Sequence, residues 1–269
     1  MTSSTGRKCA MITGAGSGIG AATALRFSEA GYDVVLNYQK NRDGADAIAA
    51  SCRAFSVETL VVKGDVAEDH DCRAMALAAS ERFGKIDALV NNAGVTRYAG
   101  PNDMDASNAG DFDAIFRVNV TGTYQMVRAA LPFLKRAERS SIVNVSSDSA
   151  FSGSGSSLAY ASSKGAINTM TIGLARSLAP FVRVNAVCPG FVDTTWALAW
   201  QDAQEHERFK HRLKETTPLN MIPAASDIAD AIVWLSDRAP CITGQCLVID
   251  SGAHLVEANF LDTCIAPQM

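Results

Sequence analysis

The sequence lacks the long hydrophobic runs that mark a membrane protein or a secreted precursor. No stretch approaches the roughly 18 consecutive apolar residues of a membrane-spanning helix. The opening MTSSTGRKCAMITG also has no apolar run of the kind found in a signal peptide. We therefore expect a soluble, cytoplasmic protein with no membrane partner.

Charge of either sign is sparse and is not gathered into blocks. Charged residues make up 19% of the chain, and the formal net charge is −4. Proteins that bind nucleic acid usually carry a basic patch or arm, and the sequence shows neither. The composition therefore gives no indication of a nucleic-acid partner.

Cysteine and histidine occur without the spacing of a metal site or a disulfide framework. The 7 cysteines form no CxxC pair, and the 4 histidines show no metal-ligand spacing. We predict free thiols, most of them small buried hydrophobes, and no bound metal. Cys188 lies in VCPG with no base beside it, which disfavours a nucleophilic role.

What the sequence does contain is a regular alternation of short apolar runs and helix-length segments. The runs lack polar alternation, which is typical of strands buried on both faces of a sheet. They cover residues 9–13, 33–38, 59–64, 86–91, 141–146, 182–187 and 246–250. The alternation predicts an α/β fold in a single domain over residues 1–269, with a parallel sheet covered by helices. Ligands of such sheets bind beyond the carboxyl ends of the strands.

The segment TGAGSGIG (13–20) follows the first predicted strand and opens a helix. Its glycines allow a positive φ and a close approach to a ligand. The helix start supplies free N–H groups and a positive dipole for a pyrophosphate. No GK[ST] follows, which disfavours a P-loop kinase or ATPase. The segment predicts a dinucleotide site with contacts from Gly14, Gly16, Ser17, Gly18, Ile19 and Gly20.

The end of the second predicted strand bears on the choice between NADP(H) and NAD(H). NAD binders typically place a carboxylate there for the ribose 2′-hydroxyl, whereas this chain has Asn37 and Tyr38, followed by Lys40 and Arg42. A lysine attracts a 2′-phosphate that a carboxylate would repel, so the sequence favours NADP(H). NAD(H) is the alternative, in which Asn37 serves a plain ribose and the basic side chains are solvated.

Tyr160 and Lys164, in YASSK, would share one face of a helix. One interpretation is a chance pair on a surface helix. The other is that the lysine charge makes the phenol easier to ionise, as a proton-transfer catalyst requires. Lowering a phenol pKa from about 10 to about 7 takes roughly 4 kcal/mol. A unit charge about 4 Å away, at an effective dielectric near 20, supplies on the order of 4 kcal/mol.

In order and spacing these motifs resemble those of the short-chain dehydrogenase/reductase family. The resemblance runs from about residue 7 to 254 and rests on TGAGSGIG (13–20), GDV (64–66), NNAG (91–94), VNV with Asn119, SS with Ser147, YASSK (160–164), NAVCPGFVDT (185–194) and ITGQCLVIDSG (242–252). It implies a doubly wound Rossmann fold of seven parallel strands. It also implies hydride transfer between NAD(P)(H) and a ketone or secondary alcohol, most like 3-oxoacyl-carrier-protein reductases and sugar dehydrogenases such as glucose dehydrogenase.

The resemblance further implies a catalytic tetrad of Asn119, Ser147, Tyr160 and Lys164. Tyr160 would act as general acid or base, and Lys164 would tune it and bind the cofactor ribose. Ser147, which stands 13 residues before the tyrosine, would donate to the substrate oxygen, and Asn119 would hold a water leading to Lys164. Further cofactor contacts would come from Asp65, Val66, Asn92, Ala93, Gly94, Pro189, Gly190, Val192 and Thr194.

Substrate selection in this family usually lies in a lid after the nicotinamide loop, here about residues 194–216. An apolar pocket would be lined by Phe151, Trp196, Leu198 and Trp200, or these side chains would pack the lid on the body. The basic stretch from His206 to Lys214 would attract an acidic substrate or carrier. Alternatively it is a solvated face, since glutamates offset most of its charge.

Other functional classes stay open at this point. An NAD-dependent sugar or polyol dehydrogenase would use the same motifs, whereas a nucleotide-sensing regulator would keep its output without Tyr160. A structural interaction protein would not bind a nucleotide tightly. Family members usually form tetramers or dimers through the helices at about 111–136 and 158–178 and the C-terminal strand. The resemblance therefore implies a homotetramer or homodimer that acts on a small carbonyl or alcohol substrate.

Overall fold

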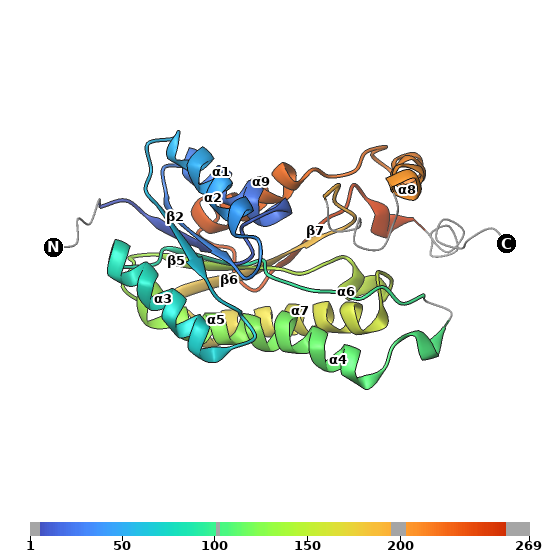
Figure 1. Cartoon of the computed structure of the whole chain (residues 1–269), viewed down its shortest axis with the longest axis horizontal. Coiled ribbons are helices and arrows are strands. Elements are labelled where there is room, and N and C mark those ends of the chain that lie inside the picture. The colour runs from blue at the N-terminus through green and yellow to red at the C-terminus, as the bar shows by residue number, and fades with distance from the viewer. Residues whose placement is uncertain (1–5, 101–102, 195–202, 257–269) are drawn as a thin grey trace.

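A computed structural model of the chain describes residues 6–100, 103–194 and 203–256. Its strands form one parallel sheet in the order β3-β2-β1-β4-β5-β6-β7 (Figure 1). They are β1 (Cys9–Ile12), β2 (Asp33–Tyr38), β3 (Thr59–Lys63), β4 (Ala88–Asn91), β5 (Ser140–Val145), β6 (Val182–Pro189) and β7 (Cys246–Ile249). Each strand coincides with one predicted apolar run to within about two residues at either end. The predicted doubly wound α/β fold is confirmed.

Helices cover both faces of the sheet (Figure 1). One face carries α1 (Gly18–Glu29), α2 (Arg42–Arg53) and α9 (Ala225–Asp237). The other carries α3 (Asp69–Phe83), α4 (Ala109–Phe116), α5 (Thr123–Leu134) and α7 (Leu158–Leu178). Shorter or peripheral elements are α6 (Ser149–Ser152), α8 (Ala203–Thr216), the π-helical turn η2 (Arg117–Gly122) and the 3₁₀ turns η1 (Met104–Ala106) and η4 (Ala253–Leu255).

Successive residues of the inner strands contribute to two separate hydrophobic cores. In β1, Cys9 and Met11 pack with α3, α5 and α7, whereas Ala10 and Ile12 pack with α1, α2 and α9. Strand side chains alternate between the two faces of a sheet, and here both faces are covered. This is why the strands read as continuous apolar runs.

Within the described ranges, no helix has the length and apolar character needed to cross a bilayer. The same ranges contain no group of three or more His, Cys, Asp and Glu side chains arranged to hold a metal ion.

Candidate active site

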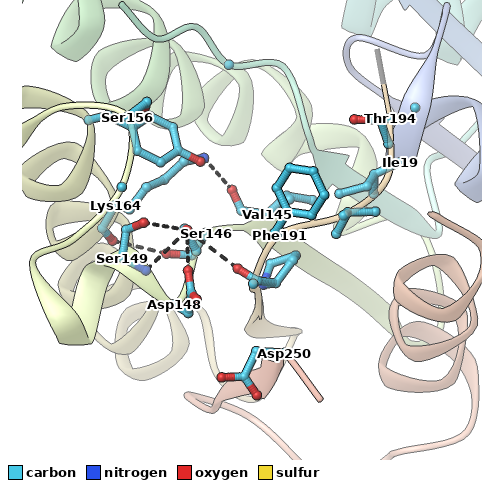
Figure 2. Close-up of a pocket in the computed structure, with 18 of the residues that line it drawn as sticks. Ile19, Val145, Ser146, Asp148, Ser149, Ser156, Lys164, Phe191, Thr194 and Asp250 are labelled. Atoms are coloured by element: carbon cyan, nitrogen blue, oxygen red, sulfur yellow. Dashed lines mark hydrogen bonds between the residues drawn. The ribbon is translucent and has the colours of Figure 1, made fainter. Parts of the chain in front are cut away.

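A cleft of about 1770 Å³ opens where the strands end. The loops after β1, β4, β5 and β6 line it, together with part of α8. In open parallel sheets this edge is the usual ligand site, because the loops there are free to vary while the strands stay rigid. Figure 2 shows side chains from these loops around it.

The glycine loop after β1 is held close to the neighbouring strand end. Gly14 and Gly18 have positive φ values of 64° and 54°. A Cβ on Gly20 would lie 2.4 Å from the Gly14 carbonyl oxygen, so only glycine fits there. Asn92 Nδ2 donates to the carbonyl oxygens of Thr13 (2.9 Å) and Gly14 (3.1 Å). The loop geometry is therefore fixed by backbone packing.

Not every predicted residue of this loop lies in the cleft. Gly14, Ser17, Gly18 and Ile19 line it. Gly16 faces Asn41 instead, since a Cβ there would lie 3.0 Å from the Asn41 carbonyl oxygen. Gly16 and Gly20 thus let the loop pack, and the other residues form its open face.

The start of α1 is free to receive an anion. Ser17 is its N-cap residue but makes no side-chain capping bond, and the first turn holds no acidic residue. The first-turn N–H groups of a helix have no partner within the helix, and the helix dipole makes this end positive. The loop and helix start therefore fit the pyrophosphate of a dinucleotide.

At the end of β2, the side chains that line the cleft are only partly those that the sequence predicted. Asn37 lines the cleft, accepts from Gly14 N (3.1 Å) and donates to Gly64 O (3.0 Å). Gln39 lines it too, with Nε2 2.6 Å from Asp65 Oδ2. Tyr38 and Lys40 do not line it. Residues i and i+2 lie on the same face of a strand. Because Asn37 faces the cleft, the same alternation places Gln39 there as well.

The residues predicted for the adenosine and nicotinamide sides line the cleft. On one side are Asp65, Val66, Asn92, Ala93 and Gly94, and on the other Pro189, Gly190, Val192 and Thr194. The Asp65 carboxylate is oriented by two bonds, from Ala67 N (2.9 Å) and Gln39. Both sets follow strand ends, so the cleft is long enough to take an extended ligand across the sheet edge.

Asn119 lies behind the cleft wall, in η2, and is only 2% exposed. Its Oδ1 accepts from Val95 N (2.8 Å), and its Nδ2 donates to Val95 O and Ser163 Oγ (both 3.0 Å). Both amide hydrogens are thus used within the protein. Asn119 ties the loop after β4 to α7, next to Gly94, whose Cβ position would be 3.4 Å from Asn119 Oδ1.

Tyr160 and Lys164 share one face of α7, as the spacing predicts. Ser157 caps the helix by accepting from Tyr160 N (3.2 Å). Lys164 Nζ donates to Val145 O at 2.8 Å (Figure 2) and lies 5.4 Å from the centre of the Tyr160 ring. The pair therefore faces the cleft, and the interpretation of a surface pair is wrong.

The electrostatics of this pair differ from the expectation. Burial raises the pKa of Tyr160 to about 12, although a hydrogen bond with Ser147 acts to lower it. Burial also lowers the pKa of Lys164 to about 8. Desolvation disfavours the charged form of each group, and the charge of Asp148 adds to the rise in the pKa of Tyr160. Tyr160 is fully protonated at neutral pH.

The three nearby serines have separate environments. Ser146 Oγ donates to Lys164 O (3.1 Å), which ties β5 to α7. Ser147 Oγ lies 3.0 Å from Asp148 Oδ1 and 3.1 Å from Ser149 Oγ. Because Ser147 also bonds to Tyr160, the structure brings together the hydroxyl and the phenol that the resemblance selects.

Two carboxyl groups beside these serines were not among the predicted site residues. Asp148 and Asp250 both line the cleft, and a Cβ on Gly190 would lie 3.3 Å from Asp148 Oδ2 and 2.7 Å from Asp250 Cβ. Burial raises the pKa of Asp148 to about 6, and the charge of Asp250 adds to this. Asp148 comes shortly after β5 and Asp250 directly after β7, and this position after a strand end is the one sequence signal that points to them.

The substrate end of the cleft is bounded by the loop after β6 and by α8. Phe191 packs against Phe209 of α8, with ring centroids 5.1 Å apart. Asp193 joins the same elements through Lys210 Nζ (2.6 Å) and His206 Nε2 (3.3 Å). Phe151 also lines the cleft. Trp196, Leu198 and Trp200, predicted for this pocket, lie outside the described residues.

The basic stretch of α8 is partly neutralised. Lys210 pairs with Asp193 and Glu207, and His211 with Glu215. Arg208 and Arg212, one turn apart on the helix, line the cleft, and neither forms an ion pair with a described residue. Two cations thus remain at the cleft mouth.

Cys188 does not have the environment of a nucleophile. It is fully buried in β6. A hydrogen bond with Cys246 of the neighbouring strand, together with burial, raises the pKa of its thiol. Reactive cysteines have lowered pKa values and are accessible, so a nucleophilic role is disfavoured.

Comparison with known proteins was made against family models, curated sequences and solved structures. Residues 14–254 match a family model described as enoyl-(acyl carrier protein) reductase. A ketoacyl reductase assigned to the granaticin polyketide synthase of Streptomyces violaceoruber is 38% identical over 247 residues, covering 92% of this chain and 96% of that protein. The 3-oxoacyl-[acyl-carrier-protein] reductase FabG of Staphylococcus aureus is 32% identical over 252 residues, covering 92% and 98%.

The structural comparison gives the same picture. A crystal structure from Burkholderia xenovorans, of a protein assigned to the short-chain dehydrogenases/reductases, superimposes with a TM-score of 0.86 at 42% identity. The match covers 93% of this chain and 99% of that one.

Proposed function

Because this chain belongs to the short-chain dehydrogenase/reductase family, we propose that it reduces a carbonyl group to a secondary alcohol with NADP(H). We further propose 3-oxoacyl thioesters as its substrate class. The observation that carries the proposal is the convergence of Ser147, Tyr160 and Lys164 at one end of a cleft whose other end is the glycine loop.

The proposed cofactor contacts follow the length of the cleft. The glycine loop and the start of α1 hold the pyrophosphate, and Asp65 and Val66 bind the adenine side. Val192 and Thr194 hold the nicotinamide carboxamide. Lys40, exposed beyond β2, attracts the 2′-phosphate from solvent rather than from within the cleft. Bound NADPH supplies the hydride.

The proposed proton chemistry uses the chain's own hydroxyl groups. Ser147 donates to the substrate oxygen, where negative charge develops during reduction. Tyr160 then gives its phenolic proton to that oxygen, and an alkoxide is a strong enough base to take it even when the pKa of Tyr160 is about 12. Lys164, as an ammonium ion, stabilises the resulting phenolate. A phenol that is protonated at neutral pH suits the reductive direction.

A thioester carried on a phosphate-bearing group fits the mouth of the cleft. Arg208 and Arg212 line it from one face of α8, and arginine binds phosphate through two parallel hydrogen bonds. The apolar rings of Phe191 and Phe209 lie on the way to the serines. These features support a substrate with an apolar acyl part and an anionic tail.

A sugar or polyol dehydrogenase is the second candidate, and the two carboxyl groups favour it. Asp148 and Asp250 provide acceptors at the inner end of the cleft. Such acceptors suit a substrate with several hydroxyl groups better than an acyl chain.

One substrate screen distinguishes the candidates. The purified protein is assayed with 3-oxoacyl thioesters, aldoses and diketones, each with both cofactors. We expect the highest kcat/KM for a 3-oxoacyl thioester with NADPH. An NADH preference of about tenfold or more, worth about 1.4 kcal/mol, overturns the cofactor assignment. Faster aldose oxidation overturns the substrate class. Tight nucleotide binding with no turnover of any carbonyl points to a sensor.

We also propose that the chain assembles as a homotetramer or homodimer through α4, α5 and α7. Exposed apolar side chains on two of these helices support this, namely Tyr124, Leu158 and Ile172. Light scattering of the purified protein would give the mass of two or four chains, and the mass of one chain would contradict the assignment.

A further inference from the structure

The hydroxyl of Ser147 has one hydrogen and several nearby acceptors. Its Oγ accepts from Ser149 N (3.2 Å). The acceptors within reach of its hydrogen are Asp148 Oδ1 (3.0 Å), Ser149 Oγ (3.1 Å), the Tyr160 hydroxyl and, more distantly, Pro189 O (3.5 Å). A substrate oxygen in the cleft must compete with all of these for that single hydrogen.

The charge of Asp148 decides that competition. An ionised carboxylate is a stronger acceptor than a neutral hydroxyl or carbonyl oxygen. When Asp148 is ionised it therefore takes the Ser147 hydrogen, and Ser147 turns a lone pair toward the cleft. A lone pair can accept from an alcohol but cannot stabilise the oxygen of a ketone. When Asp148 is protonated, its hold on the hydrogen weakens and Ser147 can donate to the substrate.

The surroundings of Asp148 let it change charge at accessible pH. Tyr160 and Lys164 face this end of the cleft from α7, with the Lys164 ammonium on Val145 O. Asp250 faces it after β7 (Figure 2), and Asp250 Oδ2 lies 2.7 Å from His254 Nδ1. The loop after β6 adds Pro189 and Gly190, which are uncharged. Asp148 makes no ion pair with any described residue.

We propose that Asp148 is a positioning residue that sets the direction of the Ser147 hydroxyl. As a carboxylic acid it frees the hydrogen for a carbonyl oxygen and favours reduction. As a carboxylate it holds the hydrogen and favours alcohol binding and oxidation. This inference rests on the proposed function, since it assigns Ser147 to the substrate oxygen. The raised pKa of Asp148, about 6, sets the range in which the change occurs.

The kinetic test compares Asp148→Asn with the wild-type enzyme as a ratio of kcat for reduction at saturating NADPH. The amide keeps the shape and the Oδ1 acceptor but never ionises. We expect a ratio near one at about pH 5, rising to about tenfold at about pH 8, a gain of about 1.4 kcal/mol. Taking a ratio at each pH cancels the effect of the proton consumed by the reaction, which is the same for both enzymes. The control is Glu81→Gln, which changes an exposed carboxylate of α3 to an amide. It should give a ratio near one at every pH.

A ratio for Asp148→Asn that stays constant across this pH range would overturn the proposal. Loss of activity at every pH with unchanged nucleotide affinity would do the same, because it would make Asp148 directly necessary for turnover.

A second measurement does not depend on activity or on folding of the asparagine variant. The carboxyl infrared band of Asp148 is titrated in wild type and in Ser147→Ala. If Ser147 donates to the carboxylate, its loss removes a bond that stabilises the charged form, so the titration midpoint moves to higher pH. An unchanged or lower midpoint contradicts the proposal even if no carbonyl substrate is found. The proposed function fails separately, through the substrate screen.

Discussion

One end of the cleft is shaped by the backbone and the other by side chains. The glycine-loop end is shaped by the backbone. A Cβ on Gly20 would be 2.4 Å from Gly14 O, and the Asn92 side chain donates to backbone carbonyl oxygens of the loop. The substrate end is shaped by side chains from distant segments, such as Asp148, Phe191 and Arg208. Backbone shape demands particular residues at fixed spacing, whereas a side-chain wall can be built in many ways. The residues of the first end are therefore tightly constrained, whereas those of the second end can vary without changing the fold.

The largest expected effect is a loss of turnover at one end of the cleft without a loss of nucleotide binding at the other. Tyr160→Phe removes the proposed proton donor but leaves the glycine loop unchanged. We expect kcat to fall by roughly 10³-fold, within the range for loss of a general acid, while the Kd for NADPH stays within about threefold. Stopped-flow turnover and fluorescence titration measure the two quantities. A comparable loss in binding would show that the ends are not separable.

A smaller effect distinguishes neighbouring serines at the substrate end. Ser147→Ala removes a donor to the developing charge, and we expect about a 10²-fold loss in kcat. Ser146→Ala removes a bond to Lys164 O and should cost about 1 kcal/mol of unfolding free energy, with a modest change in kcat. Chemical denaturation and steady-state kinetics of both variants test this. The reverse pattern would mean that the wrong serine has been chosen.

At the glycine-loop end, adding one methyl group should reduce nucleotide affinity more than changing a charged side chain does. Gly20→Ala forces the loop away from Asn92, and we expect about 1–3 kcal/mol of lost stability and weaker nucleotide binding. Gly173→Ala is the matched control, because a Cβ there meets nothing within 4 Å. It lies within α7 and should stabilise the protein by about 0.5–1 kcal/mol. Equal effects of the two changes on nucleotide affinity would argue against a close-packed loop.

The smallest effect concerns cofactor choice. Lys40 is exposed and does not line the cleft, so its attraction for a 2′-phosphate is screened by water. Lys40→Glu should raise the Kd for NADPH by about 3–10-fold, or about 0.7–1.4 kcal/mol, and leave NADH binding nearly unchanged. Titration with both nucleotides checks this. An equal loss for both would remove Lys40 from the 2′-phosphate site.

The same contrast explains what could be predicted from the sequence. Strands such as β1 were predictable because both faces are buried, and the pairing of Tyr160 with Lys164 followed from helix periodicity. Asp148, Gln39 and Asp250 were missed because no local pattern gathers them. The topology of the sheet brings all three to the lining of one cleft. The pKa of Tyr160 was expected to fall, but it rises because desolvation is a property of the folded site.

The most direct measurement is a crystal structure of the protein with NADPH bound. The account predicts the pyrophosphate on the glycine loop and the start of α1, and the nicotinamide ring beside the Tyr160 hydroxyl and Ser147 Oγ. A nucleotide bound outside this cleft, or a nicotinamide ring turned away from Tyr160, would contradict it.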